Sequence, residues 1–253
     1  RQKLLIAAGI GIFVLVFILL LAGIRGCSNY IHSRKTASKN AVSMNVSSDS
    51  SKSASSASDP SESDTASDST VDSPVSLTLS VVGDCTLGTD ETFDYDTSLN
   101  AYYENYGADY FMQNVKSIFE ADDLTIANNE GTFTESYDRE DKTFAFKAPA
   151  SFSGIYSCSS VEAVNTANNH SHDYGEQSFQ DTMDALDAEG IVHFGYDETA
   201  VMDVKGVKVG LIGIYELNDH LERKQQLEDN INKVKNEGAE LVIVIFHWGN
   251  EKE

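Results

Sequence analysis

Short runs of consecutive apolar residues recur along the chain from residue 77 onward. They lie at residues 77–82, 124–127, 161–166, 207–214 and 241–246. Runs such as LVIVIF have no polar alternation, which is typical of strands buried on both faces of a mainly parallel sheet. The pattern therefore predicts five strands at these positions.

Helical periodicity occupies the segments between these runs. Apolar side chains recur at i, i+4 and i+7 in three groups: Phe111, Val115 and Ile118; Phe179, Met183 and Leu186; and Leu227, Ile231 and Val234. Gly190 and Gly238 follow the last two groups, where a left-handed C-cap favours glycine. The alternation of strands and helices predicts an α/β layered sandwich over residues 77–253, which is long enough for one core.

The amino-terminal part of the chain has a different character. Residues 4–24 carry no charge, and as a helix they would be about 31 Å long, close to the roughly 30 Å of a membrane core. We predict one transmembrane helix after a cytoplasmic stub of residues 1–3. A cleaved signal peptide and a lipoprotein anchor at Cys27 are the alternatives.

A serine-rich segment follows the predicted helix. Residues 43–73 contain 14 Ser among 31 residues, with almost no bulky side chains, so residues 25–76 are expected to form a disordered linker. The basic residues that flank residues 4–24 do not by themselves favour an external domain. Stalks of this composition are commonest outside the cell, and we therefore expect a single-pass cell-membrane protein with an extracellular C-terminal domain.

The charge of the chain limits its partners. The sequence has 18 basic and 40 acidic residues, a net charge of −22, and most of the acidic residues lie in residues 77–253. Such a body repels nucleic-acid phosphates, so no nucleic-acid partner is expected, and anionic substrates would bind only through cations. The three cysteines have no C-x-x-C spacing and indicate neither a disulfide framework nor a structural zinc site.

Polar side chains follow four of the predicted strands. They are Asp84; Asn128, Asn129 and Glu130; Asn168, Asn169 and His170; and His247, Trp248 and Glu251. A single Asp or Asn after a strand is usually a helix cap or a turn residue. Four such ends at the carboxyl edge of one sheet, where α/β proteins bind ligands, indicate a metal site. We expect Asn128, Trp248 and Glu251 to line its pocket.

These donors suit particular ions and a particular chemistry. Carboxylate, amide and imidazole groups together favour divalent Mn, Fe or Zn, and a pair of such ions activates water and holds both reacting oxygens of a phosphoester. Asp84 is the expected bridging ligand, with Asn169 and His247 as neutral ligands. His170 would face the substrate as a general acid, with Asp173 orienting its ring.

Four segments resemble the CapA, or poly-γ-glutamate capsule biosynthesis, family. They are VVGDCTLG (81–88), ADDLTIANNEGTFT (121–134), TANNHSHDYGEQSFQDTMDALDAEGI (166–191) and VIFHWGNEKE (244–253). The resemblance implies a calcineurin-like metallophosphatase fold, with Asp84, Asn169 and His247 as metal ligands and His170 facing the substrate. It also implies Glu130 as a further ligand, to which Asn128 and Asn129 are alternatives.

The resemblance also implies a function. The chain would be a membrane-anchored extracellular protein of capsule or poly-γ-glutamate biosynthesis, with a metal-dependent hydrolase-like domain acting on an anionic polymer or a phosphoester. Its partners would be the lipid bilayer and other membrane subunits of a polymer synthase. Cys85 and Thr86 follow Asp84 where ordinary metallophosphatases have a D-x-H histidine, which leaves a non-catalytic assembly or export subunit as the alternative. A general external phosphodiesterase is a third hypothesis.

Late G-H-x-x-H histidines do not occur before Glu253, so we expect the domain to be truncated at its C-terminus.

Overall fold

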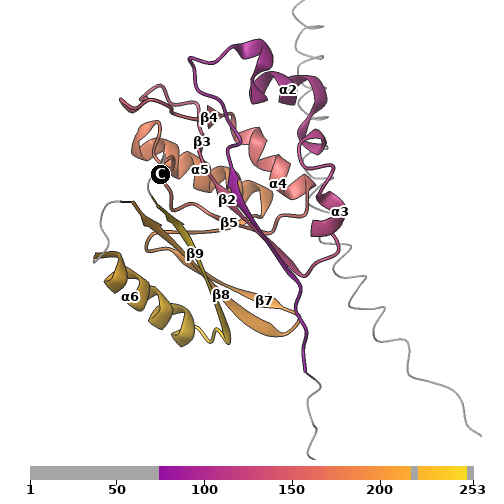
Figure 1. The fold of residues 1–253 in the computed structure, drawn as a ribbon, viewed down its shortest axis with the longest axis vertical. Coiled ribbons are helices and arrows are strands. Elements are labelled where there is room, and N and C mark those ends of the chain that lie inside the picture. The colour runs from indigo at the N-terminus through magenta and orange to yellow at the C-terminus, as the bar shows by residue number, and fades with distance from the viewer. Residues whose placement is uncertain (1–73, 218–221, 250–253) are drawn as a thin grey trace, which may run out of the picture.

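The computed structural model describes residues 74–217 and 222–249 of the chain, and it contains two main β-sheets (Figure 1). The first sheet is parallel, in the order β1-β2-β5-β6. Its strands are β1 (Leu79–Cys85), β2 (Leu124–Asn129), β5 (Ala163–Asn165) and β6 (Val192–Phe194). The second sheet has the order β7-β8-β9, with β7 antiparallel and β9 parallel to β8. Its strands are β7 (Thr199–Val204), β8 (Val207–Glu216) and β9 (Leu241–Trp248).

Short helices and a small third sheet complete the described part of the chain. The α-helices are α2 (Leu99–Tyr106), α3 (Lys116–Phe119), α4 (Gly154–Cys158), α5 (Gly175–Glu189) and α6 (Glu222–Asn236). Single 3-10 turns lie at η2 (Tyr95–Thr97), η3 (Ala108–Tyr110) and η4 (Ala150–Ser153). Strands β3 (Thr132–Phe133) and β4 (Lys147–Ala148) pair in parallel.

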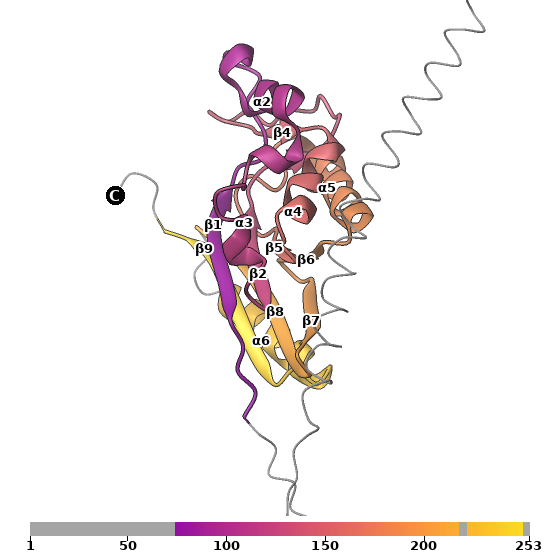
Figure 2. The same cartoon turned by 90° about the vertical axis from the view of Figure 1, so that its right-hand side faces the viewer.

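The elements stack in four layers, helix, sheet, sheet and helix (Figures 1 and 2). Successive residues of a strand point to opposite faces, and β2 illustrates the consequence. Its Ala127 packs with α4 and α5, whereas Ile126 packs against Leu211 of the second sheet. In β8, Ile212 faces the other way and packs against Val234 of α6. The inner strands β2, β5 and β8 are therefore buried on both faces, as their apolar runs predict, whereas the edge strands β1 and β9 are only partly covered, contrary to the expectation from the run LVIVIF.

The sequence predicts the elements unevenly. All five predicted strands form, α5 and α6 form at the predicted periodicity, and Gly190 caps α5 in the left-handed conformation. The expected helix through Phe111, Val115 and Ile118 is wrong, because only residues 116–119 are α-helical there and Val115 and Ile118 are exposed. The expectation of a single sheet edge is also wrong, because β9 pairs with β8 in the second sheet and not with β1.

The amino-terminal predictions fall outside the described residues. The stub at residues 1–3, the membrane span at residues 4–24 and all of the linker except residues 74–76 lie in the segment that the structure does not describe. Within residues 74–217 and 222–249, no helix has the length and apolar character needed to cross a membrane.

Candidate functional site

The carboxyl ends of β1, β2 and β9 meet around Asp84, Asn128 and His247. Strand β1 carries a bulge between Val81 and Asp84, which places Asp84 opposite Asn128 in the pairing with β2. The Asn128 Nδ2 group donates to Asp84 Oδ1 at 2.7 Å and lies 3.3 Å from His247 Nδ1. His247 Nδ1 is 3.6 Å from the same Asp84 oxygen. Residues far apart in the chain, on two different sheets, are therefore brought to one point.

A chain of side-chain amides fixes which atom Asn128 presents to this point. The backbone N–H of Ala167 can only donate, and it donates to Asn165 Oδ1 at 3.2 Å. The Asn165 Nδ2 group must then face Asn128, and it donates to Asn128 Oδ1 at 2.8 Å. Because the oxygen of Asn128 accepts in the core, its Nδ2 donor faces Asp84. Asn128 thus orients Asp84 and offers no oxygen to a metal ion in this arrangement.

His247 lies between Asp84 and Asn169. Its Nε2 atom is 2.8 Å from Asn169 Oδ1, which can only accept, so Nε2 carries the proton and Nδ1 is the acceptor nitrogen of the ring. That nitrogen faces Asp84 and the Nδ2 group of Asn128. Asp84, Asn169 and His247 therefore lie together, with Asp84 and Asn169 at opposite ring nitrogens of His247.

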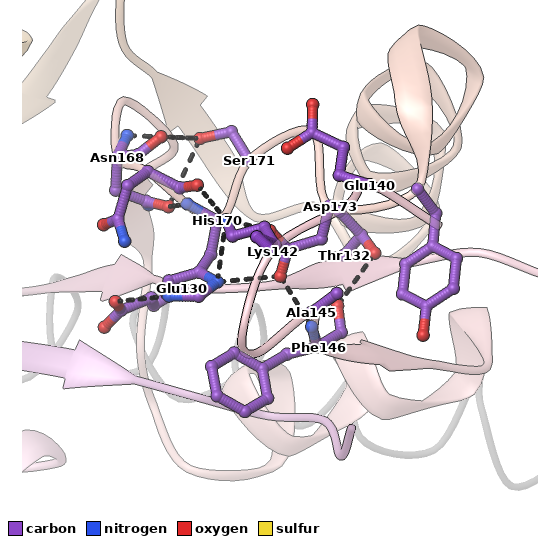
Figure 3. Close-up of polar contacts among 12 residues, drawn as sticks. Glu130, Thr132, Glu140, Lys142, Ala145, Phe146, Asn168, His170, Ser171 and Asp173 are labelled. Atoms are coloured by element: carbon purple, nitrogen blue, oxygen red, sulfur yellow. Dashed lines mark hydrogen bonds and ion pairs between the residues drawn. The ribbon is translucent and has the colours of Figure 1, made fainter. Parts of the chain in front are cut away.

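A second group of side chains surrounds His170 (Figure 3). Asp173 is fully buried, and its Oδ2 atom lies 2.8 Å from His170 Nδ1 and accepts a 2.6 Å hydrogen bond from the Phe146 N–H. The other oxygen accepts from Lys142 Nζ at 2.6 Å. Lys142 also donates to the carbonyl oxygen of Asn169, so it joins Asp173 to the segment that carries His170. The proton on Nδ1 is held by Asp173, and Nε2 faces Glu130 at 3.7 Å from its Oε1 atom.

Glu130 connects the two groups. The pKa of Glu130 is raised to about 7, chiefly by burial and next by the negative charge of Asp84, while His170 opposes the shift. Burial, together with the charges of Asp84 and Glu130, also raises the pKa of the Cys85 thiol to about 11. The thiol is therefore protonated at neutral pH, which is typical of a packed rather than a nucleophilic cysteine. Two acidic side chains held this close leave a place where a cation is favoured.

The spacing of Asp84 and His247 is close to that of two ligands of one divalent ion, although the Asn128 Nδ2 group lies against both in this arrangement. Two ligands bound at about 2.1 Å in tetrahedral geometry lie about 3.4 Å apart, close to the 3.6 Å between Asp84 Oδ1 and His247 Nδ1. In the part of the chain that the structure describes, no three His, Cys, Asp or Glu side chains form such a group on their own. Completing a coordination sphere would therefore require Glu130 or the amide oxygen of Asn169 to turn toward the ion.

The remaining predicted residues lie in different places. Asn129, one alternative to Glu130, points into the core, where its Oδ1 accepts from the Tyr156 hydroxyl and its Nδ2 donates to the carbonyl of Gly131. Trp248 is 70% exposed and packs on Phe246, on the face of β9 opposite His247. The structure therefore does not bring Trp248 to the site. Glu251 lies outside the described residues.

Two residues of the site are missed by the sequence reasoning. Lys142 stands in a loop of mixed charges and has no periodicity or motif that distinguishes it. Asn165 does leave a signal, because it is a polar residue inside the apolar run at 161–166, and such a residue is fully buried only when its hydrogen bonds are satisfied.

These observations define a class of protein. The chain is a mixed α/β protein with a parallel-sheet core, consistent with a metallophosphatase-like fold, and its polar site lies at the carboxyl ends of the strands. Residues 78–253 match the family described as bacterial capsule synthesis protein PGA_cap. The chain belongs to this family.

Two curated proteins of capsule biosynthesis are similar to this chain. The chain is 25% identical over 196 residues to the PGA biosynthesis protein CapA of Bacillus subtilis (strain 168), covering 69% of this chain and 50% of the relative. It is also 25% identical over 201 residues to the capsule biosynthesis protein CapA of Bacillus anthracis, covering 69% of this chain and 47% of the relative. The chain thus spans about half the length of the curated relatives that it matches.

Proposed function

We propose that this chain carries a metal-dependent hydrolase-like domain of the metallophosphatase type that serves capsule or poly-γ-glutamate biosynthesis. The observation that carries the proposal is the position of the Asp84–His247 pair, 3.6 Å apart, next to the buried Asp173–His170 pair. The first pair offers donors for a divalent ion, and the second offers a histidine whose Nε2 faces the same space. Glu130 lies between the two pairs and interacts with both.

Each side chain of the proposed site has a separate role. A divalent ion, or two of them, would supply a charge that lowers the pKa of a bound water and neutralises an anionic substrate. Asp84 and His247 would hold the ion, with Glu130 and Asn169 as further ligands. Asp173 fixes the Nδ1 proton of His170, so Nε2, on the side of Glu130, can give a proton to a leaving group or take one from water. Lys142 keeps Asp173 in place through its 2.6 Å ion pair.

The substrate class follows from charge and from the family. With a net charge of −22, the protein would receive an anionic polymer or a phosphoester only where cations offset its own field. The relatives are described as proteins of PGA and capsule biosynthesis. We therefore place the substrate among the anionic polymers or phosphoesters of that pathway.

Turnover of a model phosphodiester by the full chain tests the proposal. The reaction is measured with added Mn²⁺, Fe²⁺ or Zn²⁺ for the wild type and for Asp84→Asn, His170→Asn and His172→Asn. His172 is the matched control, since it is a neighbouring histidine that stacks on Phe179 away from the site. Activity that requires metal, is lost in the first two variants and persists in His172→Asn is expected. Equal rates in all four proteins would contradict the proposal.

One observation favours a non-catalytic assembly or export subunit as a second candidate. Asp84 is 55% exposed, and the described residues contain no complete metal cluster of acidic, histidine or cysteine side chains. In that case a host producing only the His170→Asn chain would still make polymer. Loss of polymer, with the variant folded and correctly localised, would contradict this second candidate and favour the hydrolase.

Membrane anchoring through residues 4–24 completes the proposal. The supporting observation is the uncharged apolar length of this segment. A chain lacking residues 4–24 is expected to leave the membrane fraction, and external protease is expected to digest the C-terminal domain of the intact chain. Retention of the shortened chain in the membrane would contradict the anchor. Physical partners among the membrane subunits of a polymer synthase would be recovered by cross-linking only with the anchored form.

A further inference from the structure

Three phenylalanine rings form an exposed wall beside His170. The ring centroids of Phe93 and Phe144 are 5.8 Å apart, and those of Phe144 and Phe146 are 6.3 Å apart with planes only 10° from parallel. Phe146 in turn lies 4.7 Å from the His170 ring (Figure 3). Phe93 and Phe144 are each 47% exposed. An aromatic surface thus runs from solvent to the candidate catalytic histidine.

The backbone that carries these rings is held in place by two buried carboxylates. The N–H of Ala145 donates to Asp90 Oδ2 at 2.7 Å, and the N–H of Phe146 donates to Asp173 Oδ2 at 2.6 Å. Asp90 also accepts from the N–H and the hydroxyl of Thr92, which fixes the loop before Phe93. Exposed apolar rings on a fixed backbone are a common feature of ligand-binding surfaces.

The charges around the wall select the kind of ligand. Residues 90–94 and 138–146, the two segments that carry the rings, contain six acidic and two basic residues. Both basic side chains are already paired, Arg139 with Asp90 at 2.9 Å and Lys142 with Asp173 at 2.6 Å. Five of the acidic residues are exposed, namely Glu91, Asp94, Asp138, Glu140 and Asp141. The wall therefore attracts cations and repels anions.

Aromatic faces and negative charge together favour one chemical group. The face of a phenylalanine ring is the negative end of its quadrupole and attracts a cation within about 6 Å of its centroid. A primary ammonium is strongly hydrated, whereas a quaternary ammonium presents methyl groups that also bury apolar surface. We propose that the wall of Phe93, Phe144 and Phe146 binds a quaternary ammonium group, such as that of choline, and holds it beside His170. This binding does not require a metal ion and is independent of the proposed hydrolase activity.

Titration of the full chain with choline tests the inference, with 3,3-dimethylbutan-1-ol as the uncharged ligand of the same shape. Binding is followed by calorimetry and by the NMR signals of labelled phenylalanine rings, at constant ionic strength and without added metal. Choline is expected to shift the ring signals saturably and to bind at least about five-fold more tightly than the uncharged ligand. Equal affinity for the two ligands would show that the surface is only apolar and would overturn the proposal.

Ring substitutions locate the binding. Phe144→Leu and Phe93→Leu keep apolar side chains on two different loops but remove the π-face, and each is expected to weaken choline binding about five-fold. Phe144→Trp should bind choline at least as tightly as the wild type, because tryptophan has the strongest quadrupole. Tyr106→Leu, at a 60% exposed aromatic residue on α2, is the control and should change nothing. Unchanged choline binding in both leucine variants, or saturable binding of methyl glucoside in place of choline, would overturn the proposal.

Discussion

At the scale of single residues, two buried carboxylates hold the loops around the site. Asp173 accepts from Lys142 and Phe146 and fixes His170. Asp90 is only 1% exposed, and it holds the neighbouring loops by accepting hydrogen bonds, among them one from the N–H of Ala145. Burial alone would raise the pKa of Asp90, but hydrogen bonds from Thr92, Ala145 and Arg139 outweigh it and hold the pKa well below its usual value. The ionised form of Asp90 is therefore part of the folded structure.

Replacing Asp90 tests this role. Asp90→Ala leaves two backbone N–H groups and the Arg139 side chain without their acceptor, and the free energy of unfolding should fall by about 3 kcal/mol at pH 7. Because the pKa is lowered on folding, the stabilisation is fully present above the unfolded pKa of about 3.9 and is lost progressively as the pH falls below that value toward the lower pKa of the folded state. Denaturant unfolding between pH 3 and 7 should therefore show the difference between wild type and variant narrowing below about pH 4. Asp109→Ala, at an exposed residue, is the control and should stay within about 0.5 kcal/mol of wild type. A difference that does not depend on pH would contradict the assignment.

The chain of side-chain amides gives a second prediction at this scale. Asn165→Ala removes the shorter of two amide hydrogen bonds to Asn128 Oδ1, leaving that from Asn168 Nδ2 at 3.2 Å, and it removes the acceptor for the N–H of Ala167. We expect the free energy of unfolding to fall by about 2 kcal/mol. Affinity for Mn²⁺ should fall about 10-fold, because Asn128, held by one amide donor in place of two, positions Asp84 and His247 less firmly. Asn105→Ala, whose amide bonds only to the carbonyl of Ala101 in its own helix, serves as the control. Wild-type Mn²⁺ affinity in Asn165→Ala would show that the amide chain does not position the ligands.

The sequence predicts the members of the site better than their contacts. The residues at the strand ends and the spacing of His170 and Asp173 can be read from the motif, and the structure brings Asp84, Asn169 and His247 together. The donor role of Asn128 cannot be read in this way, because it depends on the backbone N–H of Ala167, in the loop after β5. Lys142 reaches Asp173 from a loop 31 residues away in the sequence, and no local pattern encodes that distance.

At the scale of elements, close packing of β8 against the first sheet places the amide chain. An ideal Cβ on Gly213 of β8 would overlap Asn165 Oδ1 and would lie 2.9 Å from the Cα of Gly195. Glycine at this position lets the two sheets approach one another closely and leaves room for the Asn165 amide. The same approach brings the end of β9, the neighbour of β8, to Asp84 on the other sheet.

Gly213→Ala tests this contact. The added methyl group must displace Asn165 or separate the sheets, and the free energy of unfolding should fall by about 3 kcal/mol or more. Gly83→Ala is a matched control in another strand, since a Cβ there meets no atom within 4 Å, and it should change stability by less than about 0.5 kcal/mol. Denaturant unfolding of both variants gives the measurement. Similar losses in the two would indicate a general cost of replacing glycine in a strand and would contradict the packing argument.

Sequence patterns predict long buried elements and fail for short ones. The helices α5 and α6 have 15 residues each, and their apolar periodicity is clear. The segment of Phe111, Val115 and Ile118 has the same spacing, yet only four residues there are α-helical and just Phe111 packs on the core. The division into two sheets could not be predicted either, since each buried strand gives the same apolar run whichever sheet it joins.

At the scale of the whole molecule, the acidic charge of the chain affects how a metal site can be recognised. A body with a net charge of −22 attracts divalent cations everywhere on its surface, and only a specific arrangement of ligands separates a site from this background. Among the described residues, our candidate for such an arrangement is the Asp84–His247 pair, 3.6 Å apart, beside Glu130, whose pKa is raised by the charge of Asp84. Membership of the capsule synthesis family gives this region a biological setting.

Calorimetric titration of the metal-free full chain with Mn²⁺ in about 0.15 M salt, which screens the diffuse attraction, tests the central claim most directly. Three proteins are compared. They are the wild type, a double variant of the site (Asp84→Ala and His247→Ala) and a control double variant (Asp187→Ala and His193→Ala). Asp187 and His193 form an acid–histidine pair of the same kind, 3.2 Å apart, away from the site. The account predicts saturable binding in the wild type and the control, and affinity at least about 100-fold weaker in the site variant. Equal Mn²⁺ affinity in all three proteins would contradict it.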